Sequence, residues 1–208
     1  MAIPAIEPYP MPTELPENIA QWQVDPSRAA LLVHDMQNYF LSPFTDPSAL
    51  LGNVGALKDR FSEIGAPVYY TAQPGGMSTE DRGLLMDFWG PGMTADPAHR
   101  AIVPFLEPSP GDVVLTKWRP SAFCRTDLLR MLREQGRDQL VICGVYAHVG
   151  ILMTAHESFS HDIQTFVVAD AIADFTPDFH RLALDYAASR CAVTITTRGV
   201  LSSMEGSC

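Results

Sequence analysis

Arg28-Ala-Ala-Leu-Leu-Val-His34 is a short run of mostly apolar residues with a polar residue at each end. An unbroken apolar run of this length is typical of a strand that is covered on both faces. Similar runs alternate with amphipathic, helix-like segments along the rest of the chain. We expect strands over residues 28–34, 67–72, 112–118, 139–145, 165–171 and 192–196, and helices over residues 48–64, 79–89, 126–135, 149–159 and 178–189.

This alternation of strands and helices predicts the fold class. Consecutive parallel strands need long crossover connections, which are usually helical and right-handed. We therefore expect a Rossmann-like, three-layer α/β/α fold with a mostly parallel six-stranded sheet between two layers of helices. In such a fold, ligands bind beyond the carboxyl ends of the strands.

The first 26 residues differ in composition from the rest of the chain. Prolines at positions 4, 8, 10, 12 and 16 interrupt the segment where a signal peptide would need an apolar core, so we predict an extended N-terminal arm over residues 1–26. The arm is expected to pack either across a subunit interface or along its own subunit. Because no repeat or interior linker follows it, we expect a single domain over residues 1–208.

Composition excludes several kinds of partner. With 14 Lys and Arg against 24 Asp and Glu, the chain of 208 residues has a net charge of −10, which disfavours binding to nucleic acid or to an anionic membrane surface. Its longest apolar stretch, residues 140–147, is too short to span a bilayer. Its four cysteines form no Cys-x-x-Cys pair, which favours reduced thiols over a zinc site or a disulfide framework. We expect a soluble, cytoplasmic protein.

Polar residues gather where the predicted strands end. Asp35, Gln73 and Lys117 each lie at or just after the end of a strand, and Tyr146 follows the fourth. A carboxylate close to a lysine at such an edge can act as a general acid or base. Position alone is equally compatible with a helix-capping Asp35 and a solvated Lys117.

Seven motifs occur in order over nearly the whole chain. They are Leu31-Leu-Val-His-Asp-Met-Gln37, Tyr70-Thr-Ala-Gln-Pro-Gly75, Asp81-Arg-Gly-Leu-Leu85, Phe88-Trp-Gly-Pro-Gly92, Thr116-Lys-Trp-Arg119, Gly144-Val-Tyr-Ala-His-Val-Gly150 and Val168-Ala-Asp-Ala-Ile-Ala-Asp-Phe175. In sequence and spacing they resemble the isochorismatase family. Within that family the chain resembles in particular the stand-alone hydrolases of phenazine biosynthesis, which act on 2-amino-2-deoxyisochorismate.

The resemblance implies hydrolysis of an enolpyruvyl vinyl ether. The products would be pyruvate and trans-2,3-dihydro-3-hydroxyanthranilate, or 2,3-dihydro-2,3-dihydroxybenzoate if the substrate is isochorismate. It implies Asp35 as the acid, Lys117 as its orienting partner, and four substrate-binding residues, namely Gln73, Arg82, Tyr146 and Gly150. It also implies a small anionic chorismate-derived substrate, no cofactor, no metal and a homodimer.

The wider superfamily includes cysteine amidases such as nicotinamidase, and the chain departs from that branch. Aligned on the Gly144–Gly150 motif, the position of the amidase nucleophile is Gly150, so the thiol is lost there. Cys143 and Cys124 are expected to have packing roles. Gln73-Pro74 stands where metal-binding amidases carry Asp-x-His-Pro. The alternatives left open are a siderophore-pathway isochorismatase, an amidase with its nucleophile elsewhere, and a non-catalytic homologue that docks a partner.

Other residues near these motifs have more than one interpretation. Arg82 is able to grip a carboxylate, or to pair with Glu80 or Asp87 on a helix surface. Tyr146 is able to donate a hydrogen bond to the ligand, cover its ring, or simply pack. The N–H groups of residues 149–151 are expected to form an anion site at a helix start.

Further side chains are expected to have supporting roles. His34 is expected to point away from Asp35 and pack in the core, because neighbouring strand residues face opposite sides. His148 is expected to shape its loop, and Trp89 to form part of the pocket wall. Asp170 and Asp174 are expected to cap turns. Pro120 stands where the family pattern has tyrosine.

Overall fold

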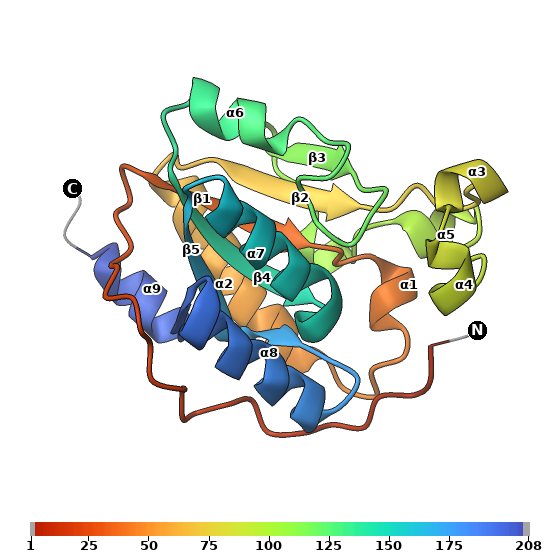
Figure 1. The fold of residues 1–208 in the computed structure, drawn as a ribbon, viewed down its shortest axis with the longest axis horizontal. Coiled ribbons are helices and arrows are strands. Elements are labelled where there is room, and N and C mark those ends of the chain that lie inside the picture. Colours follow the sequence, from red (N-terminus) through yellow and green to blue (C-terminus); the bar gives the residue numbers. More distant parts are fainter. Residues whose placement is uncertain (1–2, 206–208) are drawn as a thin grey trace.

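The six strands form one sheet in which every neighbouring pair is parallel, in the order β3-β2-β1-β4-β5-β6 (Figure 1). The computed structural model describes residues 3–205. The strands are β1 (Ala29–His34), β2 (Val68–Ala72), β3 (Val113–Thr116), β4 (Gln139–Val145), β5 (Gln164–Ala173) and β6 (Val193–Ile195). The predicted α/β fold with a six-stranded sheet is confirmed.

Helices cover both faces of this sheet, as a parallel sheet requires. One face carries α6, α7 and α8, and the other carries α2 and α9 (Figure 1). Their bounds are α2 (Ser48–Glu63), α6 (Leu128–Glu134), α7 (Leu152–Ser160), α8 (Pro177–Arg190) and α9 (Thr197–Ser203).

The core lies on the two sides of β1 and β4, the central strands. In β1, Leu31 and Val33 pack into the cluster on the α2 face, whereas Ala30 and Leu32 pack into the cluster on the α6–α8 face. Every residue of β1 and β4 is buried. This two-sided burial explains why the strand is apolar without alternation.

The segment between β2 and β3 differs from the prediction. We expected one helix over residues 79–89, but the chain forms α3 (Thr79–Arg82) and α4 (Leu85–Trp89). Gly83 between them has φ +50°, a left-handed conformation that ends the first helix. Other short elements that the apolar pattern did not reveal are α1 (Asn38–Leu41), α5 (Pro97–Arg100), the 3-10 turn η1 (Pro104–Leu106) and the π-helical turn η2 (Ala147–Ile151).

Strand order reverses next to β1, and this determines where a ligand can bind. The chain moves outward from β1 to β2 and β3, then returns to the other side of β1 with β4. Loops leaving β1 and β4 therefore diverge and leave a crevice beyond their carboxyl ends, the topological switch point. The strand arrows in Figure 1 point toward this side, where α1 and α3–α5 lie.

The N-terminal arm runs along the outer edge of its own subunit, past α8 and toward α1 (Figure 1). Ile6 is buried and pairs with Phe44 as an isolated parallel bridge. Asn18, further along, exchanges hydrogen bonds with Thr194 of β6. The arm therefore packs along its own subunit, which is one of the two expected placements, and packing across a subunit interface stays a prediction. No helix within residues 3–205 is long and apolar enough to cross a membrane.

Candidate active site

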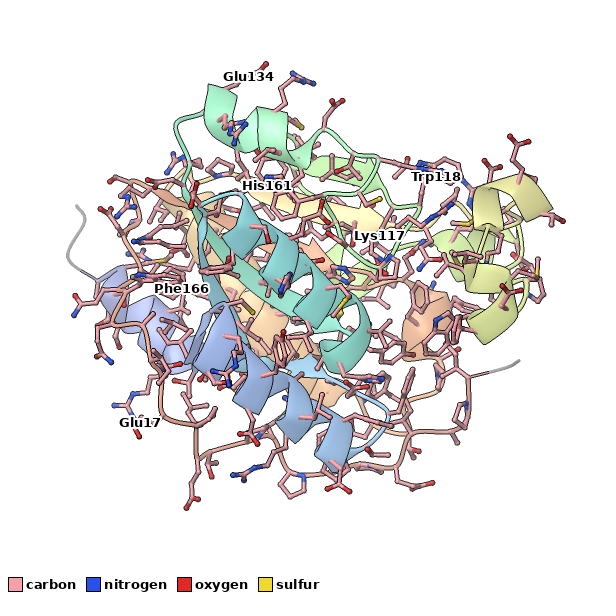
Figure 2. All side chains as sticks on the ribbon, in the orientation of Figure 1. Glu17, Lys117, Trp118, Glu134, His161 and Phe166 are labelled. Atoms are coloured by element: carbon pink, nitrogen blue, oxygen red, sulfur yellow. The ribbon has the colours of Figure 1, made fainter. Side chains whose placement is uncertain are left out.

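A pocket opens at the switch point, beyond the ends of the central strands. Figure 2 shows Lys117 past the strand ends, on the side of the sheet where α3 lies. All six predicted site residues line this pocket. Its lining residues are Ile3, Asp35, Tyr39, Phe40, Gln73, Arg82, Leu85, Trp89, Gly92, Met93, Lys117, Arg119, Pro120, Val145, Tyr146, Val149, Gly150 and Phe175.

Asp35 is held at the inner end of the pocket by three side chains. The Lys117 Nζ donates to Asp35 Oδ2 at 2.7 Å, and the Thr71 hydroxyl donates to Asp35 Oδ1 at 2.6 Å. The Gln73 side-chain amide reaches Oδ2 at 3.5 Å. Asp35 is 4% exposed and Lys117 is 2% exposed, so the two residues form a buried ion pair in the wall of the pocket.

Opposing effects act on the pKa of Asp35. Burial raises it, because the charged form is poorly solvated there. The positive charge of Lys117, the neighbouring His34 and the hydrogen bonds from Lys117 and Thr71 outweigh burial and lower the pKa below its ordinary value. In the ligand-free protein Asp35 is therefore a carboxylate.

Two residues that support this site were missed from sequence. Thr71 donates to Asp35, and its Oγ1 also accepts the Asp35 backbone N–H at 3.0 Å. Gln37 is fully buried; its amide nitrogen donates to the Gln73 carbonyl at 2.9 Å, and its amide oxygen accepts from the Gln73 N–H at 2.7 Å. Thr71 and Gln73 lie two residues apart at the end of a strand and therefore share one face of the sheet. This spacing was the one sequence signal that could have placed Thr71 in the site.

Arg82 is almost fully buried and faces the pocket. Its Nε donates to the Gly90 carbonyl at 2.8 Å, and it forms no ion pair with any residue in the described range 3–205. The alternative of a surface salt bridge with Glu80 or Asp87 is therefore wrong, because the side chain is buried and bound to the Gly90 carbonyl. Burial lowers the pKa of this arginine.

Basic side chains outnumber acidic ones around the pocket. In the part of the chain that the structure describes, Arg82, Lys117 and Arg119 line it, against a single carboxylate, Asp35. Arg119 was not singled out from sequence; its guanidinium donates to the Asp81 carbonyl at 2.6 Å. A protein of net charge −10 thus contains a locally positive site, which suits an anionic ligand.

The expected anion site at residues 149–151 is not formed. The N–H groups of Val149, Gly150 and Ile151 all donate to the Tyr146 carbonyl, at 3.1–3.2 Å. The helix begins earlier than predicted, with the π-helical turn η2, so these groups already have partners. The Tyr146 hydroxyl is also engaged, since it donates to the Phe40 carbonyl at 2.5 Å. Tyr146 therefore presents its ring to the pocket.

We expected His34 to point away from Asp35, and this expectation is wrong. Asp35 has φ +52°, which turns it out of the strand, and the His34 Nδ1 lies 3.8 Å from Asp35 Oδ2. The expected burial of His34 is confirmed, and its Nδ1 lies 2.8 Å from the Val145 carbonyl. The ring occupies the space beside Gly150, where an added Cβ would lie 2.2 Å from His34 Cε1. No residue larger than glycine fits at position 150 unless His34 moves.

Replacing Gly150 with alanine is expected to lower the free energy of unfolding by about 1–3 kcal/mol, the usual cost of overpacking. The backbone there is helical, so the substitution adds no backbone strain, and the clash with His34 opposes the usual gain of alanine over glycine in a helix. Gly52→Ala in α2 is the matched control, since its Cβ would meet no atom within 4 Å, and it is expected to stabilise the helix. Urea unfolding of both variants measures the difference. A Gly150→Ala protein as stable as the wild type would show that the ring moves aside freely.

His34 is also expected to make stability depend on pH. Burial lowers the pKa of His34 to about 4, so in the folded protein it stays neutral where an unfolded histidine takes up a proton. Proton uptake then favours unfolding as the pH falls from about 6.5 toward 4, with a loss of about 3 kcal/mol. His34→Asn keeps a donor for the Val145 carbonyl but cannot titrate. Denaturant unfolding at several pH values should give a shallower acid loss in this variant, and an unchanged loss would contradict the assignment.

The loop around η2 is stabilised by Asp174. Its carboxylate accepts the His148 backbone N–H at 2.6 Å, lies 2.8 Å from the His148 Nδ1, and accepts the Phe175 N–H at 2.7 Å. Asp170 accepts the Thr197 N–H at the start of α9. Both aspartates bind backbone N–H groups, as expected. The His148 contacts agree with a role in loop shape.

Neither Cys143 nor Cys124 is placed as a catalytic nucleophile would be. Cys143 is fully buried in β4, and burial raises the pKa of its thiol far above the usual range. Cys124 is half-buried and does not line the pocket. Cys208 lies outside the described residues. Among residues 3–205, no three His, Cys, Asp or Glu side chains gather as a metal site would require.

The arrangement defines an α/β protein with a positively charged pocket at the topological switch point and a buried carboxylate and ammonium at its inner end. Residues 29–199 match the Isochorismatase domain family. The chain is 56% identical to the phenazine biosynthesis protein PhzD of Pseudomonas fluorescens, over 96% of this chain and 98% of that protein. It is 52% identical to the isochorismatase of Bacillus subtilis, over 99% of this chain and 68% of that protein.

A solved structure agrees in fold. The cysteine hydrolase of Pseudomonas syringae pv. phaseolicola superposes with a TM-score of 0.83 at 22% identity, covering 91% of this chain and 97% of that one. Together with the match over residues 29–199, these likenesses show that the chain belongs to the isochorismatase family, as its motifs predicted. It is a hydrolase of that family.

Proposed function

We propose that the protein hydrolyses the enolpyruvyl vinyl ether of 2-amino-2-deoxyisochorismate, releasing pyruvate and trans-2,3-dihydro-3-hydroxyanthranilate. The observation that carries the proposal is the buried Asp35–Lys117 pair at the inner end of a positively charged pocket. The likeness to the Pseudomonas fluorescens protein, which is named for phenazine biosynthesis, favours the amino substrate.

Vinyl ether hydrolysis needs an acid rather than a nucleophile. A proton added to the terminal methylene carbon gives an oxocarbenium ion, which captures water. The resulting hemiketal collapses to pyruvate and the ring alcohol, so that one water is consumed overall. We assign the proton to Asp35, which among residues 3–205 is the one carboxyl group that lines the pocket.

Substrate binding is proposed to protonate Asp35. Lys117 keeps this carboxyl group ionised in the ligand-free protein. A substrate carboxylate near Lys117 would offset that positive charge and raise the pKa of Asp35, so the proton inventory belongs to the two residues and the ligand together. The same contact would hold the enolpyruvyl group beside the acid.

The remaining site residues are proposed to hold the substrate. Arg82 offers a buried guanidinium to a ring carboxylate. The Gln73 amide lies within reach of both Asp35 and the pocket. The Tyr146 ring covers one face of the substrate ring, and Gly150 offers its backbone to the substrate, because His34 fills the space in its side-chain direction. No metal or cofactor is needed for this reaction.

A pyruvate-release assay with both candidate substrates tests the proposal. Faster release from 2-amino-2-deoxyisochorismate supports the proposed substrate. Faster release from isochorismate supports the alternative of a siderophore-pathway isochorismatase, which the likeness to the Bacillus subtilis protein favours. No release above the uncatalysed rate from either substrate would contradict the proposal and leave a non-catalytic, partner-docking homologue. Ammonia release from amides, abolished by thiol alkylation, would revive the amidase alternative.

We also infer a homodimer and a cytoplasmic location, both by likeness to the family. Light scattering that finds only a species of monomer mass at micromolar concentration would contradict the dimer.

A further inference from the structure

The N-terminal arm reaches the pocket although the proposed reaction assigns it no role. Ile3, the first described residue, is part of the pocket lining together with Asp35 and Phe175. In Figure 1 the start of the arm lies on the same side of the molecule as α1, where the strands end. A proline-rich segment with no regular structure is kept there by two anchors.

The first anchor is Ile6, which is 1% exposed. Its N–H donates to the Pro43 carbonyl at 2.8 Å, and its carbonyl accepts the Thr45 N–H at 3.1 Å. Its side chain packs in the core cluster on the α2 face. The segment immediately after Ile3 is thus held by both backbone and side-chain contacts.

The second anchor is the Tyr9 hydroxyl, which has a donor and an acceptor partner. It accepts the Asp174 backbone N–H at 2.7 Å and lies 3.0 Å from the His180 Nδ1. The His180 Nε2 lies 3.0 Å from the Ala169 carbonyl, which can only accept, so the ring carries its proton on Nε2. Nδ1 is then an acceptor, and Tyr9 donates its proton to it. Burial raises the pKa of Tyr9 to about 12, so the hydroxyl keeps this proton.

Tyr9 is joined to the pocket wall through Asp174. The Asp174 backbone is bound by Tyr9, and its carboxylate accepts the Phe175 N–H at 2.7 Å. The Phe175 ring lies 4.4 Å from the Tyr146 ring, centroid to centroid, and both rings line the pocket. Displacement of the arm would therefore loosen two parts of the wall, Ile3 directly and Phe175 through Asp174.

We propose that the arm is a component of the active site, with Ile3 contacting the bound substrate and Tyr9 acting as a positioning residue for Phe175. The inference rests on the proposed function. Among the described residues no hydrogen bond joins Ile3 or Tyr9 to Asp35 or Lys117, so we assign the arm to substrate binding and not to proton transfer. A change in the arm should then alter KM and leave kcat near its wild-type value.

Two variants test this inference, Tyr9→Phe and Ile3→Ala. Tyr9→Phe removes the two hydrogen bonds of the hydroxyl group, and Ile3→Ala removes one apolar contact. For each variant we expect KM to rise roughly three- to tenfold with kcat within about twofold of the wild type. Ile3→Ala leaves both anchors in place and serves if Tyr9→Phe does not fold. Tyr186→Phe on the exposed surface of α8 and Ile19→Ala on the exposed part of the arm are the matched controls, with unchanged KM expected.

Hydrogen exchange gives a readout that needs no turnover. In ligand-free Tyr9→Phe the Asp174 N–H loses its acceptor, so the amides of residues 174–175 should exchange faster than in the wild type and in Tyr186→Phe. Unchanged exchange in Tyr9→Phe would overturn the inference. If the wild type is active, a wild-type KM in both Tyr9→Phe and Ile3→Ala would overturn it as well. A wild type that releases no pyruvate would instead overturn the proposed function. Hydrogen exchange at residues 174–175 would still decide whether Tyr9 positions Phe175 in the pocket wall.

Discussion

Asp35→Asn is expected to lower kcat by roughly 10²–10⁴-fold, which is the usual contribution of a positioned general acid. The amide keeps the shape of the carboxyl group and still accepts a hydrogen bond from Lys117. It has no proton that it can transfer to carbon. Pyruvate release at saturating substrate measures the loss, and calorimetric titration of the inactive variant measures the substrate Kd.

This variant also loses half of a buried ion pair. Lys117 is 2% exposed and would face a neutral amide, so the free energy of unfolding should fall by about 3–5 kcal/mol. Activity must therefore be compared on protein shown to be folded by circular dichroism. Asp59→Asn on the exposed surface of α2 is the control and should leave kcat unchanged. Near-normal kcat in folded Asp35→Asn would mean that the proton comes from another group.

Lys117→Ala is expected to impair binding and turnover together. A charge-assisted hydrogen bond to the substrate carboxylate contributes about 1.5–3 kcal/mol, so its loss should raise KM roughly 10- to 100-fold. The kcat should fall as well, because the ammonium also orients Asp35, whose Oδ2 lies 2.7 Å from Nζ. The chain has one other lysine, Lys58 on α2, and Lys58→Ala is the matched control.

The pKa of Asp35 should move in a defined direction in this variant. With the ammonium gone, burial still raises the pKa of the Asp35 carboxyl group and its main opposing charge is lost, so this pKa should lie above its wild-type value. Carbonyl infrared difference spectra of Lys117→Ala against Lys117→Ala/Asp35→Asn, recorded over a series of pH values, should therefore show a protonated carboxyl band that persists to higher pH than in the wild type. A raised KM with normal kcat would restrict Lys117 to binding, and unchanged values of both would contradict its assigned role.

The positions of the strands followed from sequence for a definite reason. A parallel strand that is covered on both faces has no solvent side, so Leu31, Leu32 and Val33 form an unbroken apolar run that is visible without a structure. Because all parallel strands end at one edge, Asp35, Gln73 and Lys117 were expected to converge there, and the pocket contains all three. The family motifs added Arg82, Tyr146 and Gly150 to the same pocket.

Helix starts and short turns were predicted less well, because a local conformation decided them. Gly83 at φ +50° divides the expected helix over residues 79–89, and Arg82 just before it is buried. The π-helical turn η2 begins before residue 149 and engages the N–H groups that we expected to bind an anion. Neither the break at Gly83 nor the early start of η2 can be predicted from the spacing of apolar residues.

What the sequence determined by itself was therefore the sheet, its edge and the chemical groups that meet at that edge. The tertiary structure alone decided which neighbours act on them. Three contacts join segments that are distant along the chain: Thr71 donates to Asp35, Gln37 accepts from Gln73, and His34 packs beside Gly150. Tyr9 and Asp174 meet across 165 residues. Such contacts depend on packing in three dimensions, which apolar periodicity and motif spacing along one chain do not encode.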